Sequence, residues 1–300
     1  MKVINKIKST VAFIICLFFS LVVSTKLQAQ TISDFMFDTY LIKEGMSQSS
    51  VMSIYQDKVG YMWVGTQSGV DRFDGYNFKQ YAHDLKNDKT RSIGWVLDIT
   101  EDKEGNIWTV DVQGHFSKLD RSTDQWSNYT LPYRDSLFKT NKKLRYNFGT
   151  PRSIYIDSLT NNVWLGTAGL GLVSYNLSTK KTTQFFVHPE NATKYGPQER
   201  VMQVRGLSAD KLVVATDIGV QFFDTKTNKF STLFNSEDSI FLVMPNDLKI
   251  IGPTLYVANR FGAYIYNTQT GAVQTFKPVS YTHLRAHETG RNLVCRLLLE

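Results

Sequence analysis

The chain has 300 residues, 42% of them hydrophobic, which allows one large domain or two smaller ones. Its formal net charge of +7 is concentrated at the two ends. The first 29 residues hold four lysines and no acid, the last 22 hold three arginines and two glutamates, and 27 basic and 25 acidic residues lie between. This near balance argues against nucleic-acid binding by the central segment. The chain's two cysteines are Cys16 and Cys295, near its two ends. The sequence between them has no cysteine, so it can form neither a disulfide nor a thiolate metal site.

The first 29 residues are typical of a secretory signal peptide. Three lysines within the first eight residues precede an apolar stretch over residues 11–23, and Leu27-Gln28-Ala29 offers a small-residue cleavage site. An uncleaved membrane anchor is the alternative, although the apolar stretch is short for a spanning helix. We therefore expect export and a mature chain that begins near Gln30.

A segment of similar sequence then recurs five times along the chain. Trp63, Trp108 and Trp164 mark the first three copies, and Val213 and Tyr256 take the same place in the fourth and fifth. A glycine follows each marker about six residues later. Repeats of this kind indicate a propeller, a solenoid or another array.

Each copy divides into four short runs that are rich in β-branched and aromatic residues and are separated by turns with Asp or Gly, which predicts four antiparallel strands. A helical solenoid is the rival, but it needs apolar spacings of three and four over long runs, which the copies lack. Four strands per copy are typical of a propeller blade. We therefore expect an all-β fold, a β-propeller of four-stranded antiparallel blades near residues 48–81, 92–129, 152–187, 200–233 and 245–276.

Three residue types recur at fixed places and are interpreted as structural. They are Trp63, Trp108 and Trp164 at the marker, Asp57 and Asp102 before a turn, and Gly60 and Gly105 within it. We expect the tryptophans to pack between adjacent blades, with a ligand-stacking platform as the alternative. Asp can cap the N–H groups of a β-turn and Gly can adopt its positive φ. The two aspartates occupy one place in successive blades, so we do not expect them to act as a catalytic pair.

The first copy is specific enough to indicate a family. Residues 44–81 resemble the opening repeat of the two-component regulator propeller family, with matches at Gly45, Ser47, Val51, Ile54, Asp57, Gly60, Trp63, Gly65, Thr66, Gly69, Arg72, Asp74, Gly75, Phe78 and Tyr81. The resemblance covers roughly residues 33–278 and is weaker in the fourth and fifth copies. It implies the periplasmic sensor region of a Bacteroidetes hybrid two-component system, in which propellers precede a membrane helix, a histidine kinase and regulators of transcription.

The resemblance also implies partners. The intact protein would be a homodimer anchored in the inner membrane, with an oligosaccharide or another periplasmic molecule as ligand. The chain itself is expected to be non-catalytic and to need no cofactor. A scaffold for protein–protein interaction is one alternative, and a propeller lyase or glycosidase is another. An enzyme would need acids, His or Tyr clustered around the central channel, and no such cluster is evident in the sequence.

Five copies are fewer than the family's ring contains, so we expect an incomplete ring. Residues 34–40 read as a lone strand of the kind that completes a last blade. The repeat pattern ends at Pro278, and residues 280–289, SYTHLRAHET, resemble the translation of a sequencing adapter. We therefore expect residues 30–278 to form a partial propeller and residues 279–300 to be a non-native tail.

Candidate ligand-binding residues lie mainly in an insertion at residues 131–150. Its aromatic rings and planar donors suit sugar hydroxyls or acidic sugars. A solvated loop without a ligand is the alternative. The candidates are Tyr133, Arg134, Arg145 and Tyr146, with Trp95 from the preceding repeat. The histidines before the tail, His83, His115 and His188, fall in different repeats without metal-ligand spacing, so no metal site is expected.

Overall fold

The computed structural model describes residues 38–82, 94–132, 149–188, 199–235, 245–259 and 262–276. Residues 40–300 form one compact unit, and the description below concerns the described part of that unit. It contains the short 3-10 helix η3 (Ile42–Glu44) and twenty β-strands. Across the described ranges, no helix is long and apolar enough to cross a membrane.

The strands form five antiparallel sheets of four strands each. The first contains β1 (Val51–Gln56), β2 (Met62–Thr66), β3 (Gly69–Phe73) and β4 (Phe78–Ala82). The second contains β5 (Val96–Glu101), β6 (Ile107–Asp111), β7 (His115–Asp120) and β8 (Gln125–Thr130). The third contains β9 (Pro151–Asp157), β10 (Asn162–Thr167), β11 (Leu172–Asn176) and β12 (Thr182–Phe185). The fourth contains β13 (Val201–Ser208), β14 (Lys211–Thr216), β15 (Gly219–Asp224) and β16 (Lys229–Asn235). The fifth contains β17 (Asp247–Ile251), β18 (Thr254–Asn259), β19 (Gly262–Asn267) and β20 (Val273–Phe276).

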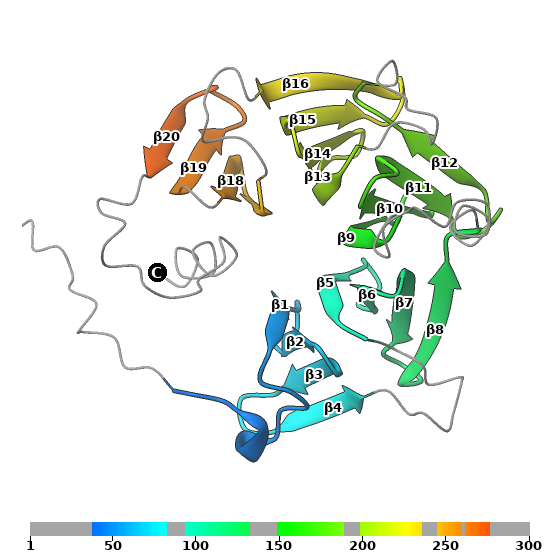
Figure 1. Cartoon of the computed structure of the whole chain (residues 1–300), viewed down its shortest axis with the longest axis vertical. Coiled ribbons are helices and arrows are strands. Elements are labelled where there is room, and N and C mark those ends of the chain that lie inside the picture. Colours follow the sequence, from blue (N-terminus) through cyan, green and yellow to red (C-terminus); the bar gives the residue numbers. More distant parts are fainter. Residues whose placement is uncertain are drawn as a thin grey trace, which may run out of the picture. The chain divides into compact units, whose positions relative to one another are not determined.

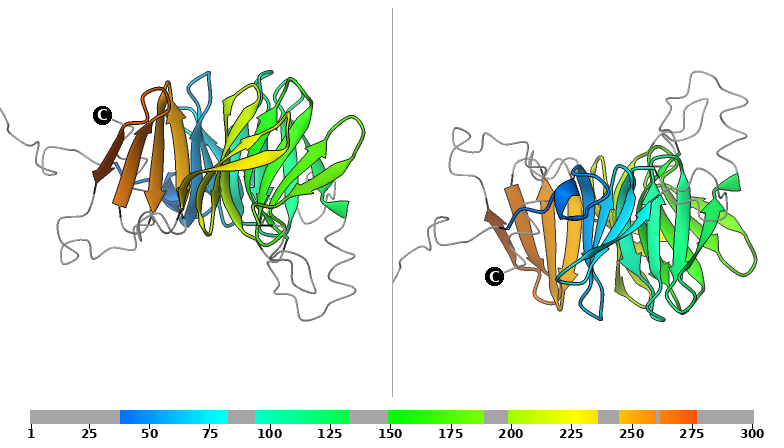
Figure 2. Two further views of the ribbon diagram at one scale, coloured as in Figure 1. Left: turned by 90° about the horizontal axis from the view of Figure 1, so that it is seen from above. Right: turned by 90° about the horizontal axis from the view of Figure 1, so that it is seen from below.

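Every sheet is a meander in which each strand pairs with its neighbour in the sequence. The first strands β1, β5, β9 and β13 face a common centre, and the fourth strands lie at the periphery (Figure 1). Seen from the edge, the sheets stand side by side with their strands running along the central axis (Figure 2). This arrangement confirms the all-β propeller with five four-stranded blades. Within the described ranges, no strand pairing joins the fifth sheet to the first.

The hydrophobic core lies between successive sheets. Four clusters of buried residues each combine side chains from two neighbouring blades. At the first junction, Trp63 and Val70 of blade 1 pack with Val96, Ile99 and Ile107 of blade 2. Strands in the middle of a blade are buried at consecutive residues, as in β6 where all five are buried, because each blade is covered on both faces. Blade-to-blade contact is therefore the main source of hydrophobic stabilisation.

The prediction of a lone strand at residues 34–40 is wrong for the three of these residues that the structure describes. Residues 38–40 lie outside any strand, while residues 34–37 fall outside the described ranges. The Tyr40 ring packs instead against Phe73 and Phe78, with centroids 5.0 and 5.8 Å away. This contact fixes the chain on the outer edge of blade 1 before η3. The predicted signal peptide at 1–29 and the tail at 279–300 also fall outside the described residues.

Candidate functional site

The predicted ligand residues are mostly not placed by the structure. Tyr133, Arg134, Arg145 and Tyr146 lie outside the described residues. Trp95 is described, directly before β5, and is 46% exposed. Its carbonyl oxygen accepts a hydrogen bond from the Val112 N–H at 3.0 Å, so the backbone is fixed while the ring meets solvent.

The repeated aspartate of blade 1 organises the β1–β2 turn. Asp57 Oδ1 accepts hydrogen bonds from the N–H groups of Val59, Gly60 and Tyr61 at 2.8–3.0 Å. Its Oδ2 accepts from the Trp63 indole Nε1–H at 2.7 Å. Gly60 has a φ of 106°, which a residue with a Cβ would adopt only with strain. The carboxylate thus satisfies the turn and orients the tryptophan that packs on blade 2.

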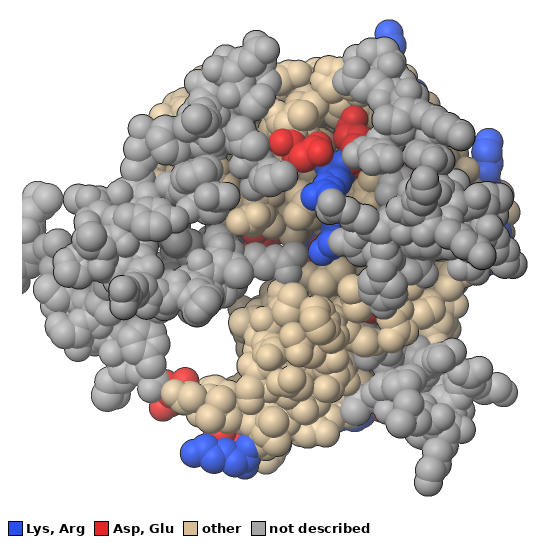
Figure 3. Space-filling view, viewed as in Figure 1, with Lys and Arg blue, Asp and Glu red and all other residues tan. Residues whose placement is uncertain are grey.

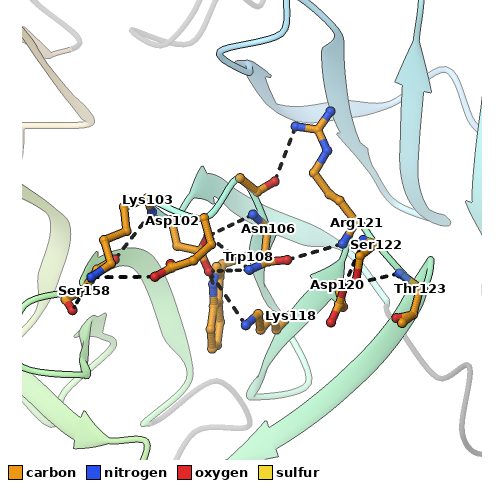
Figure 4. Close-up of polar contacts among 12 residues, drawn as sticks. Asp102, Lys103, Asn106, Trp108, Lys118, Asp120, Arg121, Ser122, Thr123 and Ser158 are labelled. Atoms are coloured by element: carbon orange, nitrogen blue, oxygen red, sulfur yellow. Dashed lines mark hydrogen bonds and ion pairs between the residues drawn. The ribbon is translucent and has the colours of Figure 1, made fainter.

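Blade 2 repeats this arrangement (Figure 4). Asp102 accepts from the Asn106 N–H at 2.8 Å and from the Trp108 indole N–H at 2.9 Å. The Gly105 N–H donates to the Asp102 carbonyl, and φ is 87° at Gly105. Lys118 Nζ lies 3.9 Å from Asp102 Oδ2. The same three residue types therefore perform the same local task in both blades.

Arg121, in the β7–β8 turn, connects blade 2 back to blade 1. Its Nη2 lies 3.0 Å from Asp57 Oδ2, and its Nη1 lies 3.6 Å from the Glu101 carboxylate. The guanidinium also lies 5.8 Å from the Tyr61 ring centroid. The side chain of Arg121 is 21% exposed, so its charge is largely removed from water and needs these partners.

A second polar arrangement surrounds the centre of the sheets, and sequence reasoning missed it. The third residue of each of the first four inner strands bonds to the next inner strand or, in the fourth case, to the residue directly before it. The pairs are Ser53 Oγ with the Val96 carbonyl at 3.5 Å, Asp98 Oδ2 with the Ile154 N–H at 3.0 Å, Ser153 Oγ with the Val204 N–H at 2.7 Å, and Gln203 Nε2 with the Asn246 carbonyl at 3.5 Å. These bonds join neighbouring blades along the axis. The available signal was a polar residue at the third place of each of these inner strands.

Arg205 concentrates charge in this axial arrangement. Its guanidinium forms two hydrogen bonds to Asp98, at 3.0 and 3.2 Å, although 107 residues separate them. Nη1 also donates to Ser153 Oγ at 3.3 Å, and Asp247 lies 3.9 Å from Nη2. The view along the axis shows acidic and basic side chains gathered beside the centre (Figure 3). Arg205 therefore joins three inner strands, β5, β9 and β13, and also lies near β17, the inner strand of the fifth blade.

The electrostatics of the axial groups limit their chemistry. Burial opposes the charged form of Arg205, but Asp98 and Asp247 together raise the pKa of its guanidinium. Burial, with the nearby Glu101 and Asp57 charges, raises the pKa of Tyr55 to about 12. With these raised pKa values, Tyr55 and Arg205 both keep their protons at neutral pH. They can donate hydrogen bonds, so the arrangement suits binding and interblade contact.

The described residues contain no group of three or more His, Cys, Asp or Glu side chains that could hold a metal ion. His115 is engaged locally, with Nδ1 3.0 Å from Asp111 Oδ2 across a single turn. His188 lies at the end of a described range, and its backbone N–H donates to Glu199 at 3.2 Å. His83 falls outside the described ranges.

Comparisons with known proteins identify a family repeat in the first blade and relate the fold to solved structures. Residues 45–68 match the family described as "Two component regulator propeller". "Histidine kinase P4" of Formosa agariphila is 45% identical over 71 residues, which are 24% of this chain and 5% of that kinase. The chain thus spans a small part of the curated relative it matches.

Two solved structures share the blade arrangement. The extracellular domain of a hybrid two component system from B. thetaiotaomicron has a TM-score of 0.58 at 19% identity, over 80% of this chain and 32% of that one. Virginiamycin B lyase from Staphylococcus aureus has a TM-score of 0.55 at 14% identity, over 79% of this chain and 73% of that one. At such identities the likeness establishes the fold and no activity. The resemblance seen in the sequence is confirmed by the family match: the chain carries, in its first blade at residues 45–68, a repeat of the two component regulator propeller family.

Proposed function

We propose that the chain is the ligand-sensing propeller of a hybrid two-component system. The observation that carries this proposal is the family match at residues 45–68, together with 45% identity to part of a histidine kinase. The propeller fold of an extracellular domain from such a system supports it. In this role the chain binds a ligand, and the histidine kinase of the intact protein responds.

The finer parts of the proposal concern location, ligand and output. The basic, apolar and small-residue pattern of residues 1–29 supports export to the periplasm, with the intact protein anchored in the inner membrane as a homodimer. The ligand is an oligosaccharide, and the output is a change in transcription. Rigid blades with polar side chains at the axis and at the blade junctions suit recognition of a ligand rich in hydroxyl groups.

A propeller lyase is the second candidate, because the lyase from S. aureus shares the fold. The axial groups weigh against it. Tyr55 keeps its proton at neutral pH, and both Nη nitrogens of the Arg205 guanidinium donate hydrogen bonds to Asp98. A scaffold that binds only other proteins is the third candidate.

The three functions separate in one set of measurements on the full 300-residue chain, purified from the periplasm of a Gram-negative host. Thermal unfolding is followed with a panel of plant and host oligosaccharides. A ligand present at 100 times its Kd adds about 2.7 kcal/mol of stability. We expect one class of glycan to raise the Tm by several degrees without being consumed. Consumption of a glycan would favour the enzyme, and a panel without any shift would contradict glycan sensing and leave the scaffold.

A further inference from the structure

The junction between the third and fourth blades contains a cavity of about 580 Å³. The face of blade 3 forms one wall, and the β13–β14 and β15–β16 turns of blade 4 form the other. The volume lies within the range of about 300–1,000 Å³ that small-molecule sites occupy. The lining includes Trp164, Ser174 and Thr183 from blade 3, and Asp210, Thr225 and Asn228 from blade 4.

The cavity lies beside Asp157 and Trp164, which take the places of the Asp–Trp pair in blade 3. The hydrogen bond between the carboxylate and the indole N–H, present in blades 1 and 2, is not formed there. Trp63 and Trp108 donate their indole N–H to a turn aspartate six residues earlier. In blade 3 the turn is one residue longer, and Asp157 is bound to the backbone N–H and the hydroxyl of Thr160. Trp164 is 3% exposed, and its buried Nε1 has no hydrogen-bond partner among the described residues. A buried N–H of this kind indicates a missing acceptor.

Two differences between the copies of the repeat leave the cavity between blades 3 and 4 open. The residue opposite the marker on the next strand is Arg72 in blade 1, Lys118 in blade 2 and Ser174 in blade 3. Arg72 lies 4.5 Å from the Tyr61 ring centroid, and Lys118 lies 5.7 Å from that of Trp108. A long cation therefore lies over an aromatic ring in blades 1 and 2, that of Tyr61 in the first and Trp108 in the second, while Ser174 in blade 3 is too short to do so.

The second difference between the copies lies in the β15–β16 turn of blade 4. Asp120 caps the β7–β8 turn and Asp224 caps the β15–β16 turn. Each carboxylate accepts hydrogen bonds from the backbone N–H groups two and three residues later. The next residue is Arg121 in blade 2, which reaches back 3.0 Å to Asp57. In blade 4 the same place holds Thr225, which lines the cavity. The guanidinium that fills the first junction thus has no counterpart at the third.

Three acceptor side chains of the lining, those of Asp157, Asn176 and Asp210, are already engaged by donors of the protein. Asp157 is occupied by its own turn, and Asn176 Oδ1 accepts from the Thr179 N–H and hydroxyl. Asp210 is paired with Lys226 at 2.7 Å. Lys181 forms no ion pair with another described residue, so it is the lining cation that remains for an anionic group, beside Asp157 and the Asp210–Lys226 pair. Lys181 and the hydroxyls of Ser174, Thr183 and Thr225 form a lining that favours an anionic, hydroxyl-bearing molecule.

We propose that this cavity binds a sugar that carries a carboxylate, a hexuronate. Lys181 supplies the charge that balances the carboxylate, and the hydroxyls bind the remaining sugar oxygens. Phe185, which is half-buried in the lining, provides aromatic surface for the apolar side of the ring. This site depends only on the junction of blades 3 and 4, so it stands apart from the proposed coupling to a histidine kinase.

Isothermal titration calorimetry of the full 300-residue chain tests the inference with glucuronate, galacturonate, glucose and acetate. We expect saturable binding of a hexuronate at least tenfold tighter than binding of glucose or acetate. Ser174→Lys restores the cation found in blade 2 and should weaken hexuronate binding at least tenfold. Lys181→Met should remove the preference for the hexuronate over glucose. Ser231→Lys, exposed on β16 outside the cavity, adds the same charge and should leave binding unchanged.

Fold and binding are separated by comparing thermal unfolding of the variants without sugar. If Ser174→Lys does not fold, Thr225→Arg fills the cavity from the opposite wall and gives the same test. Hexuronate binding that survives the filled cavity would overturn the inference, as would the absence of any hexuronate binding or equal binding of glucose. A glycan that stabilises the chain equally in Ser174→Lys would support sensing while refuting this site.

Discussion

Replacing each marker tryptophan by phenylalanine is predicted to have unequal effects, although the substitutions are the same. Trp63→Phe, Trp108→Phe and Trp164→Phe all remove part of an indole ring that is at least 97% buried. The loss of packing is therefore similar in the three variants. The difference lies in the N–H, which donates to an aspartate in blades 1 and 2 and to no described group in blade 3.

The magnitude follows from that difference. A hydrogen bond to a charged group contributes about 1.5–3 kcal/mol, and Trp63→Phe and Trp108→Phe each lose one. A buried unsatisfied N–H costs about 1–3 kcal/mol, and Trp164→Phe removes that cost. The first two variants should therefore lose at least about 2.5 kcal/mol more unfolding free energy than the third.

The assay is urea unfolding of the 300-residue chain at 25 °C, followed by far-UV circular dichroism so that the loss of tryptophan fluorescence does not interfere. Asp57→Asn combined with Trp63→Phe gives a double-mutant cycle that isolates the pair. The double variant should lose less unfolding free energy than the sum of the losses in the two single variants. If Trp164→Phe destabilises the chain as much as the other two variants, the assigned role of the Asp–Trp bond is refuted.

Three further predictions concern other contacts. Arg205→Met leaves the buried carboxylate of Asp98 unpaired and should cost about 3–5 kcal/mol in urea unfolding, and an unchanged midpoint would contradict the axial ion pair. Gly206→Ala places a Cβ 2.2 Å from the ring of Tyr155, so overpacking should cost about 1–3 kcal/mol, and a neutral variant would refute the close approach. Burial raises the pKa of Asp71, whose Oδ1 has no described partner, so wild-type stability should fall relative to Asp71→Asn as the pH rises through the raised pKa, starting from about pH 4. Parallel pH profiles of the two proteins would contradict that burial effect.

The fold was predictable because the repeat encodes local structure. Turn residues such as Asp57 and Gly60 act within four residues of one another, and the strand residues between them alternate toward two neighbouring blades. The sequence of one copy therefore contains most of the information needed for one blade. Adjacent blades follow because the buried faces need partners.

The axial ion pair and the cavity were not predictable in this way. Asp98 and Arg205 are 107 residues apart and occupy different positions of their repeats, so only the ring arrangement brings them together. The cavity results from small residues, Ser174 and Thr225, at places where blade 2 carries Lys118 and Arg121. A serine in a strand gives no signal by itself, and its effect appears only when the two walls are placed against each other.

The claim that the chain binds a ligand through a blade junction is tested most directly by hydrogen–deuterium exchange of the 300-residue chain with and without saturating glucuronate. Slower exchange is predicted at residues 157–185 and 209–228, which contain the lining of the cavity, with unchanged exchange in blades 1 and 2. Protection confined to the first two blades, or no protection under conditions where the sugar is in large excess, would contradict the claim.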